Sequence, residues 1–148
     1  MAKSHSTLKD ALQDLKSRCA KPKNVVFDID GTLLLRKNPN HLICKYYAIL
    51  CDNSCCEVTL LTARPENMRQ NTIKQLSKND LHNFDNLIMK QSETLENEEC
   101  FKRRLIKEIN PEISIGNRWY DLKIDDTLKI IFEDQFIVGD SFWLKVLN

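Results

Sequence analysis

Two aspartates that follow an apolar run, Asp28 and Asp30, are the strongest candidates for chemistry in this sequence. The run VVFDIDGTLL, residues 25–34, starts with β-branched and aromatic residues that predict a buried strand, and Gly31 then lets the chain turn out of the sheet. Two carboxylates held close together repel each other, so at least one must be protonated or bound to a metal ion. The pair therefore predicts chemistry at this strand end rather than packing.

Other polar residues follow predicted strands that come later in the chain. The run EVTLLT, residues 57–62, ends at Thr62, and the run ISIG, residues 113–116, is followed by Asn117 and Asp121. Because the carboxyl ends of parallel strands meet at one edge of a sheet, we expect these side chains to gather there with the aspartate pair. Oxygen ligands in this number suit Mg²⁺. Together with a lysine they suit phosphoryl transfer, in which charge on phosphate oxygens must be neutralised.

Alternating strands and helices must hold these groups in place. The alternation indicates βαβ units, and the continuous apolar strands indicate a parallel sheet that is covered on both faces by helices. We therefore predict an α/β protein with a three-layer Rossmann-like fold and a mainly parallel sheet of about five strands. The predicted strands are residues 25–27, 57–62, 87–89, 113–116 and 136–138, and the predicted helices are about 7–18, 41–53, 65–79, 93–109 and 120–132.

The length and composition limit the organisation and the function. The 148 residues suit one domain, residues 1–148, in which a helix within residues 1–20 packs on the core. A net charge of +1 gives no case for binding nucleic acid by bulk attraction, although a local basic patch stays open. No apolar run is long enough to span a bilayer, and the N-terminus lacks a secretory apolar core. We expect a cytoplasmic protein with reduced cysteines and no membrane partner.

Four segments resemble the motifs of the haloacid dehalogenase-like (HAD) superfamily of phosphohydrolases. FDIDGTLL resembles the first motif, in which DxDGT follows an apolar strand, and LLTAR resembles the second, in which the strand ends in Thr or Ser. FKRRLI looks like the third motif, a helix with a lysine, and ISIGNRWYDL looks like the fourth, which is usually GDxxxD. The order matches and the segments span most of the chain. The second aspartate of the first motif marks the phosphatase branch of the superfamily.

The resemblance implies a role for each matching residue. Asp28 would attack phosphorus and carry an aspartyl-phosphate, and Asp30 would act as general acid and base. Thr62 would hydrogen-bond a phosphoryl oxygen, and Lys102 would offset negative charge. Mg²⁺ would be the cofactor. Its candidate ligands are Asp28, the backbone carbonyl of Asp30, Asn117 and Asp121, and the candidate substrate-binding residues are Gly31, Thr32, Ala63 and Arg64.

Several of these assignments have alternatives in the sequence. Asn117 stands where the fourth motif usually has an acid, and an amide oxygen can ligate Mg²⁺ but adds no negative charge. The GNRxxD form also resembles the lipin-type phosphatidate phosphatases, but the chain offers no membrane-binding helix to support that substrate. The rival candidates are Asp125 and Asp126 for the fourth motif, Lys107 and Lys90 for the lysine, Asp140 at the end of a predicted strand, and Arg118 as a phosphate contact.

The gaps between the motifs leave no room for a sizeable cap domain. Only 31 residues separate Asp30 from Thr62 and 39 separate Thr62 from Lys102, and predicted helices and strands fill both gaps. The open edge would admit an exposed phosphorylated end, or a neighbouring subunit of a homo-oligomer would close it.

The function expected from the sequence is a Mg²⁺-dependent phosphomonoester hydrolase that acts on a phosphorylated small molecule or on an exposed phosphorylated end. Two alternatives remain. One is a nucleic-acid or polynucleotide end phosphatase, for which the near-neutral charge is unhelpful. The other is a HAD-fold binding protein with impaired catalysis, which Asn117 favours and which the intact Asp28, Asp30 and Thr62 oppose.

Overall fold

Apolar runs of the sequence form the strands at the middle of the molecule. The computed structural model describes residues 2–5, 8–36, 38–121, 128–132 and 144–147. Val25, Val26 and Phe27 are buried, as expected of a strand that carries an apolar residue at each of these positions. In chain order the elements are β1 (Ala2–His5), α1 (Leu8–Arg18), β2 (Asn24–Phe27), β3 (Leu34–Leu35), β4 (Asn38–Pro39), α2 (His41–Cys51), β5 (Glu57–Pro65), η1 (Glu66–Met68), α3 (Arg69–Lys78), β6 (Asn86–Lys90), α4 (Glu98–Ile109), β7 (Ile113–Gly116), η2 (Trp119–Asp121), β8 (Leu128–Phe132) and β9 (Leu144–Leu147).

The main sheet is largely parallel. Within the described residues its strand order is β1-β9-β8-β7-β2-β5-β6, in which β8, β7, β2, β5 and β6 are parallel and β9 and β1 add antiparallel pairs at one side. The strand β2 lies at the centre, where Val26 is paired with Ser114 of β7 and with Thr59 of β5. The segments that follow β2, β5 and β7 therefore meet at one edge of the sheet.

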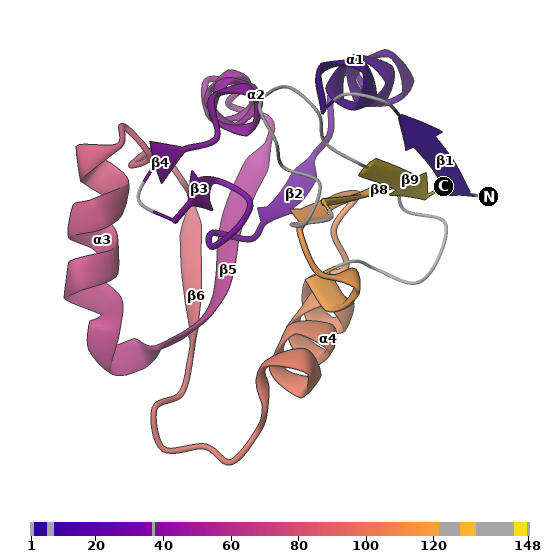
Figure 1. Cartoon of the computed structure of the whole chain (residues 1–148). Coiled ribbons are helices and arrows are strands. Elements are labelled where there is room, and N and C mark those ends of the chain that lie inside the picture. The colour runs from indigo at the N-terminus through magenta and orange to yellow at the C-terminus, as the bar shows by residue number, and fades with distance from the viewer. Residues whose placement is uncertain (1, 6–7, 37, 122–127, 133–143, 148) are drawn as a thin grey trace.

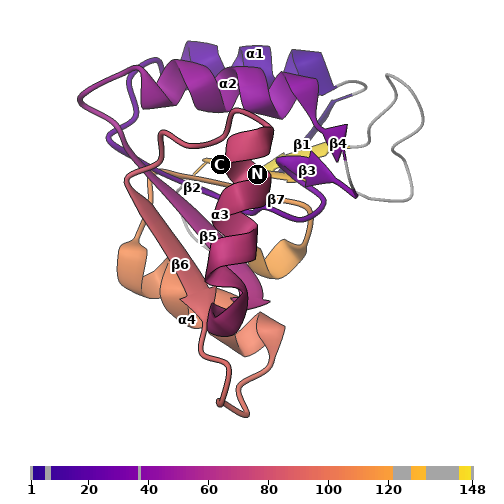
Figure 2. The same cartoon turned by 90° about the vertical axis from the view of Figure 1, so that its left-hand side faces the viewer.

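Helices cover both faces of this sheet. The larger apolar cluster joins α1, α2 and α3 to one face and includes Phe27 and Tyr47, whose rings meet edge-on with centroids 5.5 Å apart. The smaller cluster joins α4 to the other face through Val26 and Ile106. Figures 1 and 2 both show α1 and α2 together on one side of the sheet and α4 on the opposite side. The fold is the predicted three-layer, Rossmann-like α/β arrangement.

The strand predicted over residues 57–62 continues to Pro65 as β5, so the helix predicted from residue 65 begins later, as η1 and then α3. Two further predicted elements differ from the structure. The prediction of a helix over residues 120–132 is wrong for Leu128–Phe132, which form β8, because pairing with β7 and β9 outweighs a local helical pattern. The helix α4 begins at Glu98, later than predicted, where the Asn97 side chain caps it by accepting a hydrogen bond from the Cys100 amide. The predicted strand over residues 136–138 lies outside the described residues.

No additional domain lies over the carboxyl edge of β2 and β5 in the described part of the chain. Between Asp30 and Thr62 the chain forms the β3–β4 hairpin and α2, and between Thr62 and Lys102 it forms η1, α3 and β6. The prediction that there is no sizeable cap domain is confirmed for these segments. None of the described helices combines the length and the apolar character that crossing a membrane would require.

Candidate active site

Asp28 lies at the point where β2 leaves the sheet. Its backbone amide still donates a hydrogen bond of 2.9 Å to the carbonyl of Ile115 in β7, which fixes the backbone there. The chain then turns at Gly31, whose φ of +79° is a conformation that residues with a side chain rarely adopt. The buried Thr32 hydroxyl donates a hydrogen bond of 3.2 Å back to Asp28 Oδ2. Thr32 thus binds one oxygen of the Asp28 carboxylate and helps to fix its orientation.

Lys102 is the centre of a buried charge cluster. Its Nζ lies 2.6 Å from Asp28 Oδ1, 2.8 Å from Asp121 Oδ1 and 2.9 Å from a backbone carbonyl of β5. These partners use all three donors of an ammonium group, and the side chain is 1% exposed. Lys107 is exposed on the same helix and Lys90 lies at the end of β6, so Lys102 is the candidate lysine that the structure brings to Asp28.

The ionisation of this cluster is set by burial and by the ratio of carboxylates to cations. Burial raises the pKa of Asp28 from its ordinary value of 3.8 to about 7, with further contributions from Asp121 and Asp30, while Lys102 opposes the shift. Burial alone would lower the pKa of Lys102, but the two carboxylates that it contacts outweigh burial and raise it. Lys102 therefore stays protonated. Asp28 is the group that resists ionisation, first because it is buried and then because Asp121 lies beside the same cation.

The raised pKa of Asp28 predicts a pH-dependent stability. The folded protein holds the Asp28 proton more tightly than the unfolded chain does. The protonated carboxyl therefore contributes its full stabilisation below the ordinary pKa of 3.8, and this stabilisation is lost as the pH rises through about 7. Without metal, Asp28→Asn is expected to gain stability relative to the wild type as the pH rises from 3.8 to about 7, and to keep that gain at higher pH. Urea unfolding in a chelating buffer measures this. A difference in stability between the two proteins that does not change with pH would contradict it.

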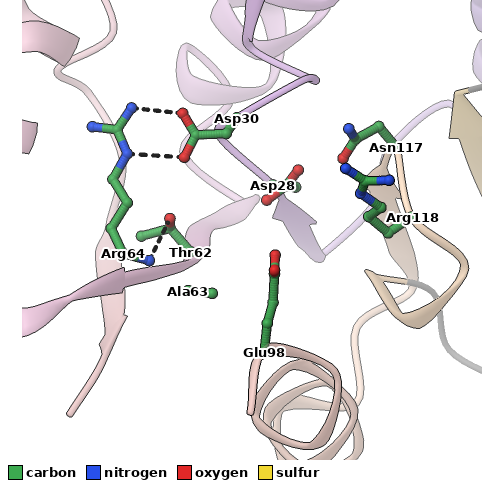
Figure 3. A pocket seen from close by; sticks show the side chains of 8 residues that line it. All are labelled: Asp28, Asp30, Thr62, Ala63, Arg64, Glu98, Asn117 and Arg118. Atoms are coloured by element: carbon green, nitrogen blue, oxygen red, sulfur yellow. Dashed lines mark hydrogen bonds and ion pairs between the residues drawn. The ribbon is translucent and has the colours of Figure 1, made fainter. Parts of the chain in front are cut away.

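Asp30 is held by a two-pronged ion pair with Arg64. Arg64 Nε donates to Asp30 Oδ2 at 2.9 Å, and Arg64 Nη2 donates to Asp30 Oδ1 at 2.7 Å. The guanidinium is fixed from behind by Thr72 and Gln75 of α3, at 3.3 Å and 2.8 Å from Nη1. The Arg64 amide also donates a hydrogen bond of 3.1 Å to Thr62 Oγ1, so Arg64 links both predicted motifs. Figure 3 shows the pair at one side of the site.

Two glycines let the segment after β7 approach the turn after β2. A Cβ atom at Gly31 would collide with the side-chain amide of Asn117, and a Cβ atom at Gly116 would collide with the Asp121 carboxylate. The buried Ser114 hydroxyl donates a hydrogen bond to the Asp121 carbonyl. These contacts bring Asn117 against the first motif and place Asp121 beside the buried lysine. The structure thus gathers the predicted residues of the first and fourth motifs.

A pocket of about 380 Å³ opens over this edge, a size within the range typical of ligand sites. Its lining consists of Asp28, Asp30, Thr62, Ala63, Arg64, Glu98, Asn117 and Arg118 (Figure 3). Of the predicted substrate-binding residues, Ala63 and Arg64 line the pocket, while Gly31 and Thr32 are absent from its lining. Glu98 was not predicted. An acid in the first turn of a helix has an ordinary structural explanation in the helix dipole, so nothing in the sequence singles out Glu98 as a site residue.

Oxygen atoms that could hold a metal ion reach the pocket from two loops. Asp28 and Asn117 line it together with Asp30. The carboxylate of Asp121 is engaged elsewhere, because Oδ1 accepts from Lys102 and Oδ2 accepts a hydrogen bond of 3.1 Å from the Arg118 amide. Among the residues described, no group of three or more His, Cys, Asp or Glu is placed to hold a metal ion. A metal site here would therefore need the Asn117 amide, backbone oxygen and water as well as carboxylate.

Three residues weighed as alternatives in the sequence cannot be placed. Asp125, Asp126 and Asp140 lie outside the described residues. Of the residues predicted for the fourth motif, Asn117 lies against Gly31 and Asp121 contacts Lys102.

Comparison with known proteins shows a likeness in fold. No protein-family model and no curated protein matches the sequence. A chain of the Pnkp1/Rnl/Hen1 complex superposes with a TM-score of 0.58 and 21% identity, covering 67% of this chain and 40% of that chain. A chain of the Pnkp1/Rnl/Hen1 RNA repair complex gives a TM-score of 0.57 and 21% identity, covering 69% of this chain and 38% of that chain. This protein is thus similar in fold to about two fifths of each of those chains.

Proposed function

We propose that this protein is a phosphomonoester hydrolase of the HAD type in which Asp28 is the nucleophile. The observation that carries the proposal is the buried contact of Lys102 with Asp28 and Asp121, next to the ion pair of Asp30 and Arg64. A nucleophilic carboxylate needs a fixed position and a nearby cation that offsets the charge of an arriving phosphate. Both are present at Asp28, and a second carboxylate follows two residues later.

The chemistry divides between the two aspartates. Asp28 attacks phosphorus and takes the phosphoryl group, while the leaving oxygen departs with a proton from Asp30. Asp30 then removes a proton from a water molecule, which attacks the aspartyl-phosphate, releases inorganic phosphate and restores Asp28. Lys102 offsets negative charge at Asp28 throughout. The Thr62 hydroxyl lines the pocket and donates to a phosphoryl oxygen.

The ion pair with Arg64 sets a condition on this role of Asp30. Both carboxylate oxygens of Asp30 face the guanidinium, so Asp30 must turn one oxygen toward the pocket before it can transfer a proton. The Asp30 side chain is 58% exposed, which leaves room for such a turn, whereas Arg64 is 16% exposed and anchored on α3. Arg64 is therefore the fixed member of the pair and Asp30 the moving one.

The charge of the site supports Mg²⁺ as the cofactor. Four carboxyl groups and three cationic side chains lie in or beside the pocket. When all of them are ionised, a phosphate dianion would meet excess negative charge. The acids are Asp28, Asp30, Glu98 and Asp121, and the cations are Arg64, Lys102 and Arg118. Mg²⁺ is commonly held by one or two carboxylates plus water, which the oxygens of Asp28 and Asn117 and the Asp30 carbonyl fit. When bound, it would neutralise charge on the phosphoryl oxygens.

Two observations favour a phosphorylated nucleic-acid end over a small metabolite as the substrate. The chains that share this fold come from a complex described as an RNA repair complex. In the described residues, no cap domain lies over the pocket, so a chain end could enter it directly. These observations support the alternative of a nucleic-acid end phosphatase, although the near-neutral net charge of the sequence does not favour it. The partner would then be a nucleic acid, or a protein that carries a nucleic acid to the site.

A substrate panel tests the proposal. Phosphate release is measured from 3′- and 5′-phosphorylated RNA and DNA oligonucleotides, from sugar phosphates and from p-nitrophenyl phosphate, with Mg²⁺ and with a chelator. We expect Mg²⁺-dependent release and a kcat/KM for at least one oligonucleotide that exceeds that of the sugar phosphates by about 10²-fold. Faster hydrolysis of sugar phosphates would overturn the choice of substrate. No release from any substrate by folded protein would favour the binding-protein alternative.

A further inference from the structure

Glu98 lines the pocket but has no part in the proposed reaction steps. It is the first residue of α4, directly after the capping residue Asn97. Figure 3 shows its carboxylate pointing from the helix end toward Asp28. Glu98 also interacts with Tyr120 of η2, whose phenol has a raised pKa, caused first by burial and then by the charge of Glu98. Glu98 is thus held between η2 and the pocket rather than extending away from the protein.

The charge of Glu98 limits what a substrate can place beside it. An ionised carboxylate accepts hydrogen bonds and donates none. Phosphoryl oxygens that approach Asp28 are themselves acceptors with negative charge, so Glu98 repels them. An acid in the first helical turn does suit the helix dipole, but the neighbouring Glu99 supplies that charge without lining the pocket. A substrate group that faces Glu98 beside the phosphate is therefore favoured when it is a hydrogen-bond donor.

We propose that Glu98 accepts a hydrogen bond from the ribose hydroxyl adjacent to the scissile phosphate, so that the pocket selects phosphorylated RNA ends. The inference rests on the proposed phosphatase function and names its substrate class. A 3′-phosphorylated RNA end carries a 2′-hydroxyl on the neighbouring carbon, and the corresponding DNA end lacks it. The pocket of about 380 Å³ leaves space for a sugar beside the phosphate.

Matched oligonucleotides that differ only in the last sugar test the inference. Phosphate release is measured from 3′-phosphorylated ends with a terminal ribose or a terminal 2′-deoxyribose, and from p-nitrophenyl phosphate. We expect the wild type to favour the ribose end by about tenfold in kcat/KM, as for loss of one hydrogen bond to a charged acceptor. In Glu98→Ala this ratio is expected to fall to about one, through slower hydrolysis of the ribose end alone.

Two further arms separate the possible causes. Glu99→Ala changes the same helical turn and is expected to keep the wild-type ratio, because Glu99 does not line the pocket. An RNA end with a 2′-phosphate and a 3′-hydroxyl also places a hydroxyl next to the phosphate. Comparing its hydrolysis with that of the 3′-phosphorylated end shows which of the two phosphate positions the pocket prefers. If p-nitrophenyl phosphate is hydrolysed but the wild type does not favour ribose, or Glu98→Ala keeps the preference, the inference is wrong. If nothing is hydrolysed, the proposed function itself fails.

Discussion

Replacing Asp28 with asparagine is expected to slow phosphate release by about 10⁴-fold or more. Asparagine has nearly the same shape, but its amide cannot attack phosphorus and form an acyl phosphate. The change leaves Thr32 and Lys102 in place: Lys102 can still donate to the side-chain oxygen, and the Thr32 hydroxyl can accept from the new amide nitrogen. The measurement is the Mg²⁺-dependent release of phosphate from the best oligonucleotide of the panel and from p-nitrophenyl phosphate.

The variant is informative because it should not fail for lack of folding. The carboxylate of Asp28 is buried and burial raises its pKa to about 7, so removing its charge relieves a cost above that pH. Asp52→Asn, at an exposed aspartate, serves as the control and is expected to keep full activity. Activity of Asp28→Asn within about tenfold of the wild type would exclude Asp28 as the nucleophile.

Lys102→Met is expected to lower the free energy of unfolding by about 3–5 kcal/mol at neutral pH. Methionine keeps much of the apolar stem but removes the ammonium group, which leaves the carboxylates of Asp28 and Asp121 buried without their shared cation. Breaking a buried ion pair from one side costs this much because the uncompensated charge stays in a poorly solvated place. Urea unfolding, followed by circular dichroism, measures the loss.

A lysine on the same helix provides the matched control for this prediction. Lys107 is exposed on α4, and Lys107→Met is expected to change the free energy of unfolding by less than about 0.5 kcal/mol. If Lys102→Met and Lys107→Met lost the same free energy of unfolding, the contacts of Lys102 with Asp28 and Asp121 would not stabilise the fold. The loss in Lys102→Met is expected to shrink when it is combined with Asp28→Asn, because one of the two buried charges is then absent.

The parts of the site that lie on strand ends could be predicted from the sequence. An uninterrupted apolar run followed by glycine shows where β2 ends, and this places Asp28 without knowledge of any distant contact. The apolar run before Thr62 predicts a strand that ends there; the structure keeps Thr62 in that strand but extends β5 to Pro65. Lys102 carries a weaker signal, because it stands four residues before Ile106 on the buried face of α4, where a charge needs a partner.

Contacts between residues far apart in the chain could not be predicted in this way. The pairing of Asp30 with Arg64 and the position of Glu98 depend on how η1, α3 and α4 are oriented against the sheet. The strand β8 was predicted as a helix because its residues, LKIIF, fit either pattern, and its pairing with β7 and β9 decides. The strands β1 and β9 are likewise defined by their antiparallel pairing, which joins residues near the two ends of the sequence.

The most direct test of the central claim is a rapid-quench experiment on Asp30→Asn with radiolabelled p-nitrophenyl phosphate. The good leaving group needs no acid to depart, whereas hydrolysis of the aspartyl-phosphate lacks its base, so the covalent intermediate should accumulate. We predict a burst of p-nitrophenolate, one per protein molecule, with the radiolabel on the peptide that contains Asp28. Steady turnover without a labelled protein, or a label on a peptide without Asp28, would contradict the assignment of Asp28 as the nucleophile.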